Sequence, residues 1–125
     1  MIDVTKRFGS VIANQDITFD ARYGEVHALV GENGAGKSTL MSIVAGLYRP
    51  DHGRVRVGGQ PVTFKSPRDA IDRGIGMVYQ HFMLVETMTV AENLLIGMPQ
   101  PGIALKTAAA AAAVRELSGR FNLDV

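Results

Sequence analysis

The sequence predicts an α/β fold in which a glycine-rich loop connects a buried strand to a helix. Residues 31–39 read Gly-Glu-Asn-Gly-Ala-Gly-Lys-Ser-Thr and fit the pattern G-x-x-x-x-G-K-[ST]. The apolar run at residues 26–30 indicates a buried strand before the loop. Apolar residues recur after it at helical spacing: Leu40, Met41, Val44 and Leu47. The rest of the chain is expected to add a small antiparallel β portion and the beginning of a helical subdomain.

The loop has the chemistry that a phosphate group needs. The first N–H groups of a helix have no partner within the helix and carry the positive end of its dipole. Gly31, Gly34 and Gly36 allow the backbone to fold tightly and to bring these amides close to phosphate oxygens. Lys37 would place a positive charge near the β- and γ-phosphates, and the Ser38 hydroxyl would hold Mg²⁺. A chance match in a glycine-rich turn is the alternative, but the predicted strand and helix around the loop favour nucleotide binding.

The length and composition indicate one soluble globular domain at most. The chain has 125 residues, of which 46% are apolar and 20% are charged. Its 13 basic and 12 acidic residues leave a formal charge of +1, so no global field would attract nucleic acid. The sequence contains no cysteine, which excludes disulfides, thiol catalysis and cysteine-ligated metal. No apolar run approaches the length of a membrane span, and the amino terminus lacks the apolar core of a signal peptide.

Short strands and turns are expected ahead of the loop. Residues 2–4 indicate an apolar strand, and residues 6–10 form a polar turn after it. Alternation at residues 17–19 predicts a half-buried strand. Residues 22–25 then turn the chain into the strand before the loop, where His27 is interpreted as a core histidine.

A hairpin is expected after the loop and its helix. Gly46 and Pro50 mark the end of the helix. Residues 54–57 alternate between apolar and basic side chains, which predicts a strand with one wet face. The glycine pair at 58–59 is a hairpin turn, and residues 62–64 continue the partner strand.

A short helix and a second buried strand follow the hairpin. A strong helix start is indicated by Ser66 at the cap, Pro67 at the first position and Asp69 three residues after the cap. This helix is expected to end at Gly74. The apolar residues 75–79 predict another buried strand, and Gln80 leaves its carboxyl end. Ligands of open α/β sheets gather outside those ends, so Gln80 is expected to face the nucleotide.

The last part of the sequence predicts helices. Thr89-Val90-Ala91-Glu92 is a capping box that opens a helix ending at Gly97. Proline and glycine at residues 99–102 interrupt the chain. A final helix is expected from about Leu105 to Phe121, and its run of alanines reflects helix propensity rather than chemistry.

Segments in register resemble the ATP-binding subunit of an ABC transporter. They are Lys-Arg-Phe-Gly at 6–9, the loop at 31–39 and Gly-Ile-Gly-Met-Val-Tyr-Gln at 74–80, and the similarity covers nearly the whole chain. The segments at 66–70, 80–85 and 89–93 look most like importers of simple sugars or nucleosides. In the subfamily that they resemble, one polypeptide carries two such domains in tandem.

The resemblance implies a partial P-loop NTPase fold of the ABC type, with ATP and Mg²⁺ as cofactors. Residues 1–125 would form the amino-terminal part of one ATP-binding domain. Its core and β subdomain would occupy residues 1–97, and residues 98–125 would begin the helical subdomain. The residues expected to bind the nucleotide are Phe8, Gly31, Asn33, Gly34, Ala35, Gly36, Lys37, Ser38 and Thr39.

The resemblance also assigns individual roles. Phe8 would stack on adenine, a contact worth roughly 1–3 kcal/mol at other base-stacking sites, although a lone loop phenylalanine is more often a core residue. Lys37 and Gln80 are the expected catalytic residues, and Ser38 and Gln80 the expected Mg²⁺ ligands. Gln80 would also position the attacking water and respond to the γ-phosphate. Read without the resemblance, a glutamine at a strand end is usually a solvated polar residue.

The partners implied by the resemblance are a membrane permease subunit and a second ATP-binding domain, as a dimer or in tandem. Residues 80–89 would contact the permease at the cytoplasmic face of the cell membrane. The apolar residues available for this contact, which could instead pack under a loop, are Phe82, Met83, Leu84 and Met88. The arginines fit solvated faces better than a nucleic-acid-binding stripe, so no nucleic acid partner is expected.

The sequence lacks other parts of an ABC-type ATPase. Phosphoryl transfer needs a second Mg²⁺ carboxylate, and members of the family supply it on an apolar strand ending in Asp-Glu, together with a switch histidine and a Leu-Ser-Gly-Gly-Gln signature. Residues 117–121 imitate the signature but lie in the helical phase of Val114, and Asp124 lacks the preceding apolar run. The chain is therefore expected to be an amino-terminal piece that binds Mg-nucleotide weakly and does not hydrolyse it.

The function implied for the parent protein is ATP hydrolysis that drives import of a sugar or nucleoside. Two alternatives stay open at this point. One is a non-transport ABC ATPase that serves translation or DNA repair. The other is a structural or partner-binding fragment whose loop stays empty.

Overall fold

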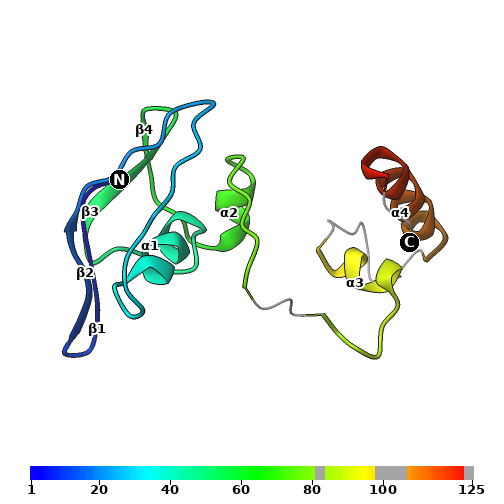
Figure 1. Ribbon diagram of the computed structural model, residues 1–125, viewed down its shortest axis with the longest axis horizontal. Helices are drawn as coiled ribbons and strands as arrows, with labels where there is room; N and C mark the ends of the chain where they lie inside the picture. Colours follow the sequence, from blue (N-terminus) through cyan, green and yellow to red (C-terminus); the bar gives the residue numbers. More distant parts are fainter. Residues whose placement is uncertain (81–83, 98–106, 123–125) are drawn as a thin grey trace. The chain divides into compact units, whose positions relative to one another are not determined.

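A computed structural model describes residues 1–80, 84–97 and 107–122 of the chain (Figure 1). The chain divides into two compact units, Met1–Val78 and Tyr79–Val125, and each is described by itself. The first unit holds β1 (Ile2–Phe8), β2 (Val11–Ile17), α1 (Lys37–Val44), β3 (His52–Val57), β4 (Gln60–Val62) and α2 (Pro67–Ile71). The second holds α3 (Val90–Gly97) and α4 (Thr107–Phe121).

The strands of the first unit form one antiparallel sheet in the order β2-β1-β3-β4. The predicted hairpin turn is confirmed, because Gly58 and Gly59 have φ of 56° and 78° and join β3 to β4. β1 extends further than predicted and pairs with β2 up to Phe8, opposite Val11. The expected turn at residues 6–10 is therefore reduced to the glycine and serine after Phe8.

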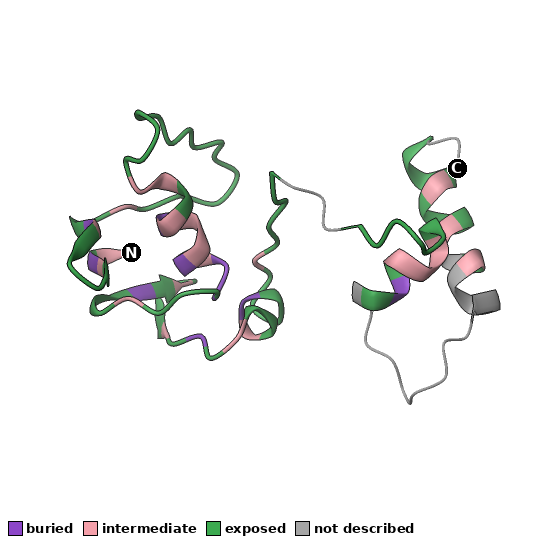
Figure 2. Ribbon diagram, turned by 90° about the horizontal axis from the view of Figure 1, so that it is seen from below, coloured by how far each residue is buried: buried purple, intermediate pink, exposed green. Residues whose placement is uncertain are grey.

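The core of this unit lies between the sheet and the helices. Its buried members are Val4, Leu40, Ile43, Val55, Phe64 and Ala70. Leu40 and Ile43 lie three residues apart in α1, which places both on the helix face that packs against the strands. Leu47 was expected on the same face, but the helix ends before it and its side chain is exposed. Figure 2 shows buried residues in α1 and in the strands.

The two buried strands predicted at residues 26–30 and 75–79 are not formed. Both segments are irregular, and Val26 is 99% exposed, Val30 90% and Val78 87%. A buried strand of an α/β sheet needs neighbouring strands for its backbone and helices over its faces. In the part of the chain that the structure describes, no strand pairs with either segment, and most of their residues are exposed (Figure 2). Ile75 is the exception, because it is half-buried and packs against the core.

The interpretation of His27 as a core histidine is also wrong, for the same reason. The side chain lies in the exposed segment, and its Nδ1 is 2.7 Å from Oε1 of Glu25. Its ring meets the Phe19 ring edge to face, with centroids 4.7 Å apart. The hydrogen bond from His27 and the backbone amide of Arg22 hold the pKa of the Glu25 carboxyl below its ordinary value.

The predicted start of α2 is confirmed. The Asp69 carboxylate accepts hydrogen bonds from the backbone amides of Lys65, at 2.7 Å, and Ser66, at 3.2 Å. The Lys65 amide is the main reason that the pKa of Asp69 lies below its ordinary value. The helix is shorter than expected: it ends at Ile71, and a turn leads from there to Gly74, whose φ is 81°.

The second unit confirms the second capping box. Oε2 of Glu92 accepts hydrogen bonds from the Thr89 amide at 2.8 Å and from the Thr89 hydroxyl at 2.9 Å. α3 then runs to Gly97 as predicted and packs against α4. Residues 117–121 lie inside α4, which confirms their interpretation as helix rather than signature. The expected break at 99–102, the helix start at Leu105 and Asp124 lie outside the described residues.

Candidate functional site

The glycine-rich loop ends where α1 begins, as the sequence predicts. Gly34 and Gly36 have φ of 86° and 82°, in the left-handed region that favours glycine. The Ala35 amide donates a hydrogen bond to the Glu32 carbonyl oxygen at 3.2 Å, which forms a tight turn. α1 follows directly at Lys37. The loop conformation therefore depends on glycine at two of its positions.

The ammonium group of Lys37 folds back onto its own loop. Its Nζ donates hydrogen bonds to the carbonyl oxygens of Gly31, at 2.7 Å, and Glu32, at 2.6 Å. These two oxygens belong to the first two residues of the loop. The positive charge of Lys37 is thus held at the loop, where the sequence pattern predicts that it meets phosphate oxygens.

Backbone amides at the start of α1 are available for a ligand. Among the described residues, no oxygen accepts a hydrogen bond from the amides of Gly36, Lys37, Ser38 or Thr39. Ser38 is exposed and its hydroxyl has no hydrogen bond in the described part of the chain. Unpaired amides at the positive end of a helix dipole suit an anion.

Strand β2 supports the end of the loop. A Cβ added at Gly36 would lie 2.2 Å from the Ala13 carbonyl oxygen and 2.7 Å from Nδ2 of Asn14. The Asn14 amide donates a hydrogen bond to the Gly36 carbonyl oxygen at 3.2 Å. The sequence did not predict the roles of Ala13 and Asn14, because no sequence pattern indicates which distant residue a small or polar strand residue will contact.

The predicted adenine contact, Phe8, lies at the end of β1 and is 43% exposed. Its ring meets Tyr48 edge to face, with centroids 5.1 Å apart and an interplanar angle of 74°. Nζ of Lys6 lies 5.4 Å from the ring centroid of Phe8. The alternative interpretation, that Phe8 is a core residue, is therefore wrong. Its contact with adenine stays a prediction.

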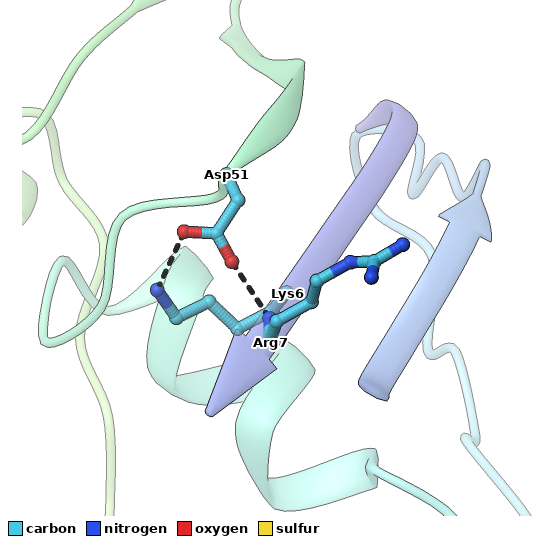
Figure 3. A network of polar contacts seen from close by, with 3 residues as sticks. All are labelled: Lys6, Arg7 and Asp51. Atoms are coloured by element: carbon cyan, nitrogen blue, oxygen red, sulfur yellow. Dashed lines mark hydrogen bonds and ion pairs between the residues drawn. The ribbon is translucent and has the colours of Figure 1, made fainter. Parts of the chain in front are cut away.

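Asp51 holds the end of β1 that carries Phe8 (Figure 3). Its Oδ2 accepts a hydrogen bond from the Arg7 amide at 2.7 Å, and its Oδ1 lies 3.2 Å from Nζ of Lys6. The Asp51 amide donates in turn to the Thr5 carbonyl oxygen at 2.8 Å. The Arg7 amide, and after it Lys6, hold the pKa of the Asp51 carboxyl below its ordinary value.

The remaining predicted site residues belong to the second unit. Gln80 is exposed, and its role beside the loop stays a prediction. Of the apolar residues expected to contact a permease, Phe82 and Met83 lie outside the described residues, whereas Leu84 is 67% and Met88 39% exposed.

The described residues contain no ready-made metal cluster and no long apolar helix. Within these residues no group of three or more His, Asp or Glu side chains could hold a metal ion. In the same part of the chain, no helix is long and apolar enough to cross a membrane.

Comparison with known proteins finds a family and relatives that this sequence resembles. The sequence model of the family described as ABC transporter matches residues 14–124. The chain is 47% identical to the guanosine import ATP-binding protein NupO of Bacillus subtilis and 51% identical to the nucleoside import ATP-binding protein NupA of Lactococcus lactis, in each case over 100% of this chain and 25% of the relative. It is 55% identical to a ribose import ATP-binding protein of Rubrobacter xylanophilus over 78% of this chain and 19% of that relative. The chain thus spans about a quarter of the length of such relatives, and the match confirms the predicted P-loop NTPase fold class.

Proposed function

The chain belongs to the ABC transporter family, and we propose that its residues 31–39 bind the triphosphate of ATP together with Mg²⁺. The observation that carries this proposal is the set of amides at the start of α1. In the described residues the amides of Gly36, Lys37, Ser38 and Thr39 have no acceptor. The Lys37 ammonium is held on the same loop by the carbonyl oxygens of Gly31 and Glu32. Such donors stabilise the charge of a polyphosphate where it would otherwise lose its hydration.

Each loop residue has a distinct part in this proposal. The Lys37 ammonium exchanges the carbonyl oxygens of Gly31 and Glu32 for oxygens of the β- and γ-phosphates. The Ser38 hydroxyl, which has no hydrogen bond in the described part of the chain, is a ligand of Mg²⁺. Hydrogen bonds to a charged group are worth roughly 1.5–3 kcal/mol each, so several of them support micromolar binding.

The adenine base stacks on Phe8 in this proposal. The Phe8 residue is 43% exposed, Nζ of Lys6 lies over its ring, and Tyr48 meets the ring edge to face. Its exposed part supports stacking by a base. The Gln80 side chain joins the magnesium site and the attacking water, as the family resemblance implies.

The chain of 125 residues binds Mg-ATP without hydrolysing it. Its sequence contains neither an apolar strand ending in Asp-Glu nor a Leu-Ser-Gly-Gly-Gln signature. Phosphoryl transfer requires a second metal carboxylate and a residue that positions water. Lys37 and Gln80 supply only part of this machinery.

The whole protein uses ATP hydrolysis to import a nucleoside or a sugar. This is supported by the relatives, which are import ATP-binding proteins for guanosine, nucleosides and ribose. It acts as a peripheral subunit on the cytoplasmic face of the membrane, with a permease that contacts residues 80–89 and with a second ATP-binding domain. The import relatives favour this role over a non-transport ATPase of translation or DNA repair.

Calorimetric titration of the purified chain with Mg²⁺ and a nonhydrolysable ATP analogue tests the loop. Wild type should bind. Lys37→Ala should abolish the measurable heat, because it removes the ammonium group that the loop holds at Gly31 and that would meet the phosphates. Lys65→Ala removes the same charge from an exposed position in the same unit and should bind like wild type. Equal affinity of Lys37→Ala and wild type would refute the proposal, and no binding by wild type would favour an empty structural fragment.

A further inference from the structure

We infer that Asn14 is a positioning residue of the phosphate loop, which turns the amide of Lys37 toward the ligand. The inference rests on the proposed function, because it assigns that amide to phosphate binding. It concerns a residue of β2, outside the loop at residues 31–39.

The hydrogen bond between Asn14 and Gly36 has only one possible polarity. The Gly36 carbonyl oxygen can only accept, so the Asn14 side chain must face it with its amide nitrogen, at 3.2 Å. The same oxygen accepts a hydrogen bond from the Leu40 amide at 2.9 Å. The Gly36 carbonyl is thus held from two directions, by the helix that follows and by the strand beside it.

Holding this carbonyl also sets the direction of the next amide. The Gly36 carbonyl and the Lys37 N–H belong to one peptide unit, and in a trans peptide the two groups point in opposite directions. A carbonyl directed at β2 therefore turns the Lys37 N–H away from β2. Glycine at φ of 82° has no Cβ to restrict its backbone, so the Asn14 contact adds to the hydrogen bond from the Leu40 amide in fixing this orientation.

The same contact strengthens the Lys37 amide as a donor. A hydrogen bond accepted by a peptide carbonyl polarises that peptide, and its own N–H becomes a better donor in return. In the described part of the chain the Lys37 N–H has no acceptor, so the gain is available to a ligand. Asn14 therefore acts on the phosphate through the peptide between Gly36 and Lys37.

Fold stability alone does not explain an asparagine at this position. Asn14 is only 6% exposed. Its Oδ1 is buried and has no hydrogen-bond partner among the described residues. A buried acceptor without a donor destabilises a folded protein, and an apolar side chain of similar size avoids this cost. The amide nitrogen is the part of the side chain that has a partner, and that partner is the loop.

Two substitutions separate positioning from support of the fold. Asn14→Leu removes the donor and the unpartnered oxygen but fills the space, whereas Asn14→Ala removes both and leaves a cavity.

We expect Asn14→Leu to resist urea at least as well as wild type and Asn14→Ala to unfold at a lower urea concentration. Both should bind Mg²⁺ with a nonhydrolysable ATP analogue about tenfold more weakly than wild type, the loss of one oriented charged hydrogen bond. Gln15→Leu, at the exposed neighbouring position, should change neither property.

The outcomes distinguish this inference from the proposed function. If the wild-type chain binds and Asn14→Leu binds equally well, Asn14 does not position the loop. If Asn14→Leu keeps both the stability and the affinity of wild type while Asn14→Ala loses both, the role of Asn14 is only structural. The inference is then also wrong.

If wild type itself does not bind, the proposed function fails, and the amide proton resonance of Lys37 in the free chain decides about Asn14. Loss of the hydrogen bond in Asn14→Leu should move this resonance to higher field, because the peptide is less polarised, and Gln15→Leu should leave it in place. An unchanged resonance in Asn14→Leu would overturn the inference whatever the binding results.

Discussion

Gly36 leaves no room for a side chain, because a Cβ built on it would lie 2.2 Å from the carbonyl oxygen of Ala13. Non-bonded atoms do not approach so closely, so either the loop or β2 would have to move. The contact joins the last glycine of the glycine-rich loop to a strand that contains none of the loop motif. It shows that the loop is supported by the sheet as well as by its own sequence.

Gly36→Ala should therefore destabilise the chain more than Gly34→Ala. Both glycines have positive φ, which costs an L residue about 1–2 kcal/mol. Only Gly36 adds the collision with Ala13, since nothing lies within 4 Å of a Cβ at Gly34. Urea unfolding of the two variants measures the difference, and equal midpoints would show that the contact with β2 does not form in solution.

Phe8→Ala should weaken binding of ATP but not binding of inorganic tripolyphosphate, each with Mg²⁺. Stacking on an aromatic ring is worth about 1–3 kcal/mol per base, so the loss for ATP should be between about fivefold and 150-fold. Tripolyphosphate has no base and serves as the internal control. A parallel loss for both ligands would mean that Phe8 supports the loop and does not contact adenine.

Ser38→Ala should reduce the contribution of Mg²⁺ to ATP binding. The hydroxyl is exposed and is the metal ligand that the loop pattern predicts. Affinity for ATP measured with Mg²⁺ and with a chelator should differ in wild type and become similar in the variant. Ser42→Ala, one turn later in α1, is the matched control and should keep the wild-type dependence on Mg²⁺. A normal Mg²⁺ effect in Ser38→Ala would exclude this serine as a ligand.

Asp51 should make the stability of the first unit depend on pH. The Arg7 amide and Lys6 lower the pKa of its carboxyl in the folded chain. The folded state therefore favours the carboxylate, so the stabilisation is present above the ordinary carboxyl pKa of about 4 and is lost as the pH falls through the lower folded value. Asp51→Asn should be less stable than wild type at pH 7, and the two should converge as the pH is lowered below about 4.

Urea midpoints measured between pH 7 and pH 3 provide this comparison. Asp20→Asn, at an exposed carboxyl with no hydrogen-bond partner in the described part of the chain, is the control and should follow wild type throughout. A difference between Asp51→Asn and wild type that stays constant over this range would show that the charge of Asp51 does not hold β1.

The sequence predicted several local features of the structure correctly. The loop conformation follows from glycines at Gly34 and Gly36, the turn into β4 from Gly58 and Gly59, and the start of α2 from Asp69. Each of these depends on groups a few residues apart, whose preferences are the same in any fold. The family, too, could be recognised from short motifs in register.

Features that depend on distant partners could not be read in this way. Hydrophobicity at residues 26–30 and 75–79 predicts buried strands, but such burial requires neighbouring strands and covering helices. Among the described residues no strand pairs with either segment, and most of their side chains stay exposed. Asn14 contacts the loop only because β2 lies beside the start of α1 in space. Tyr48 contacts Phe8 only because the segment after α1 lies beside the end of β1.

The sequence alone therefore determines that the chain carries a tight glycine-rich loop at the start of a helix, because glycine φ angles and helix-end amides are properties of neighbouring residues. Folding decides which strand holds that loop and which side chains support the exposed ring of Phe8. Such contacts join residues far apart in the chain, such as Asn14 and Gly36, and no local preference encodes them.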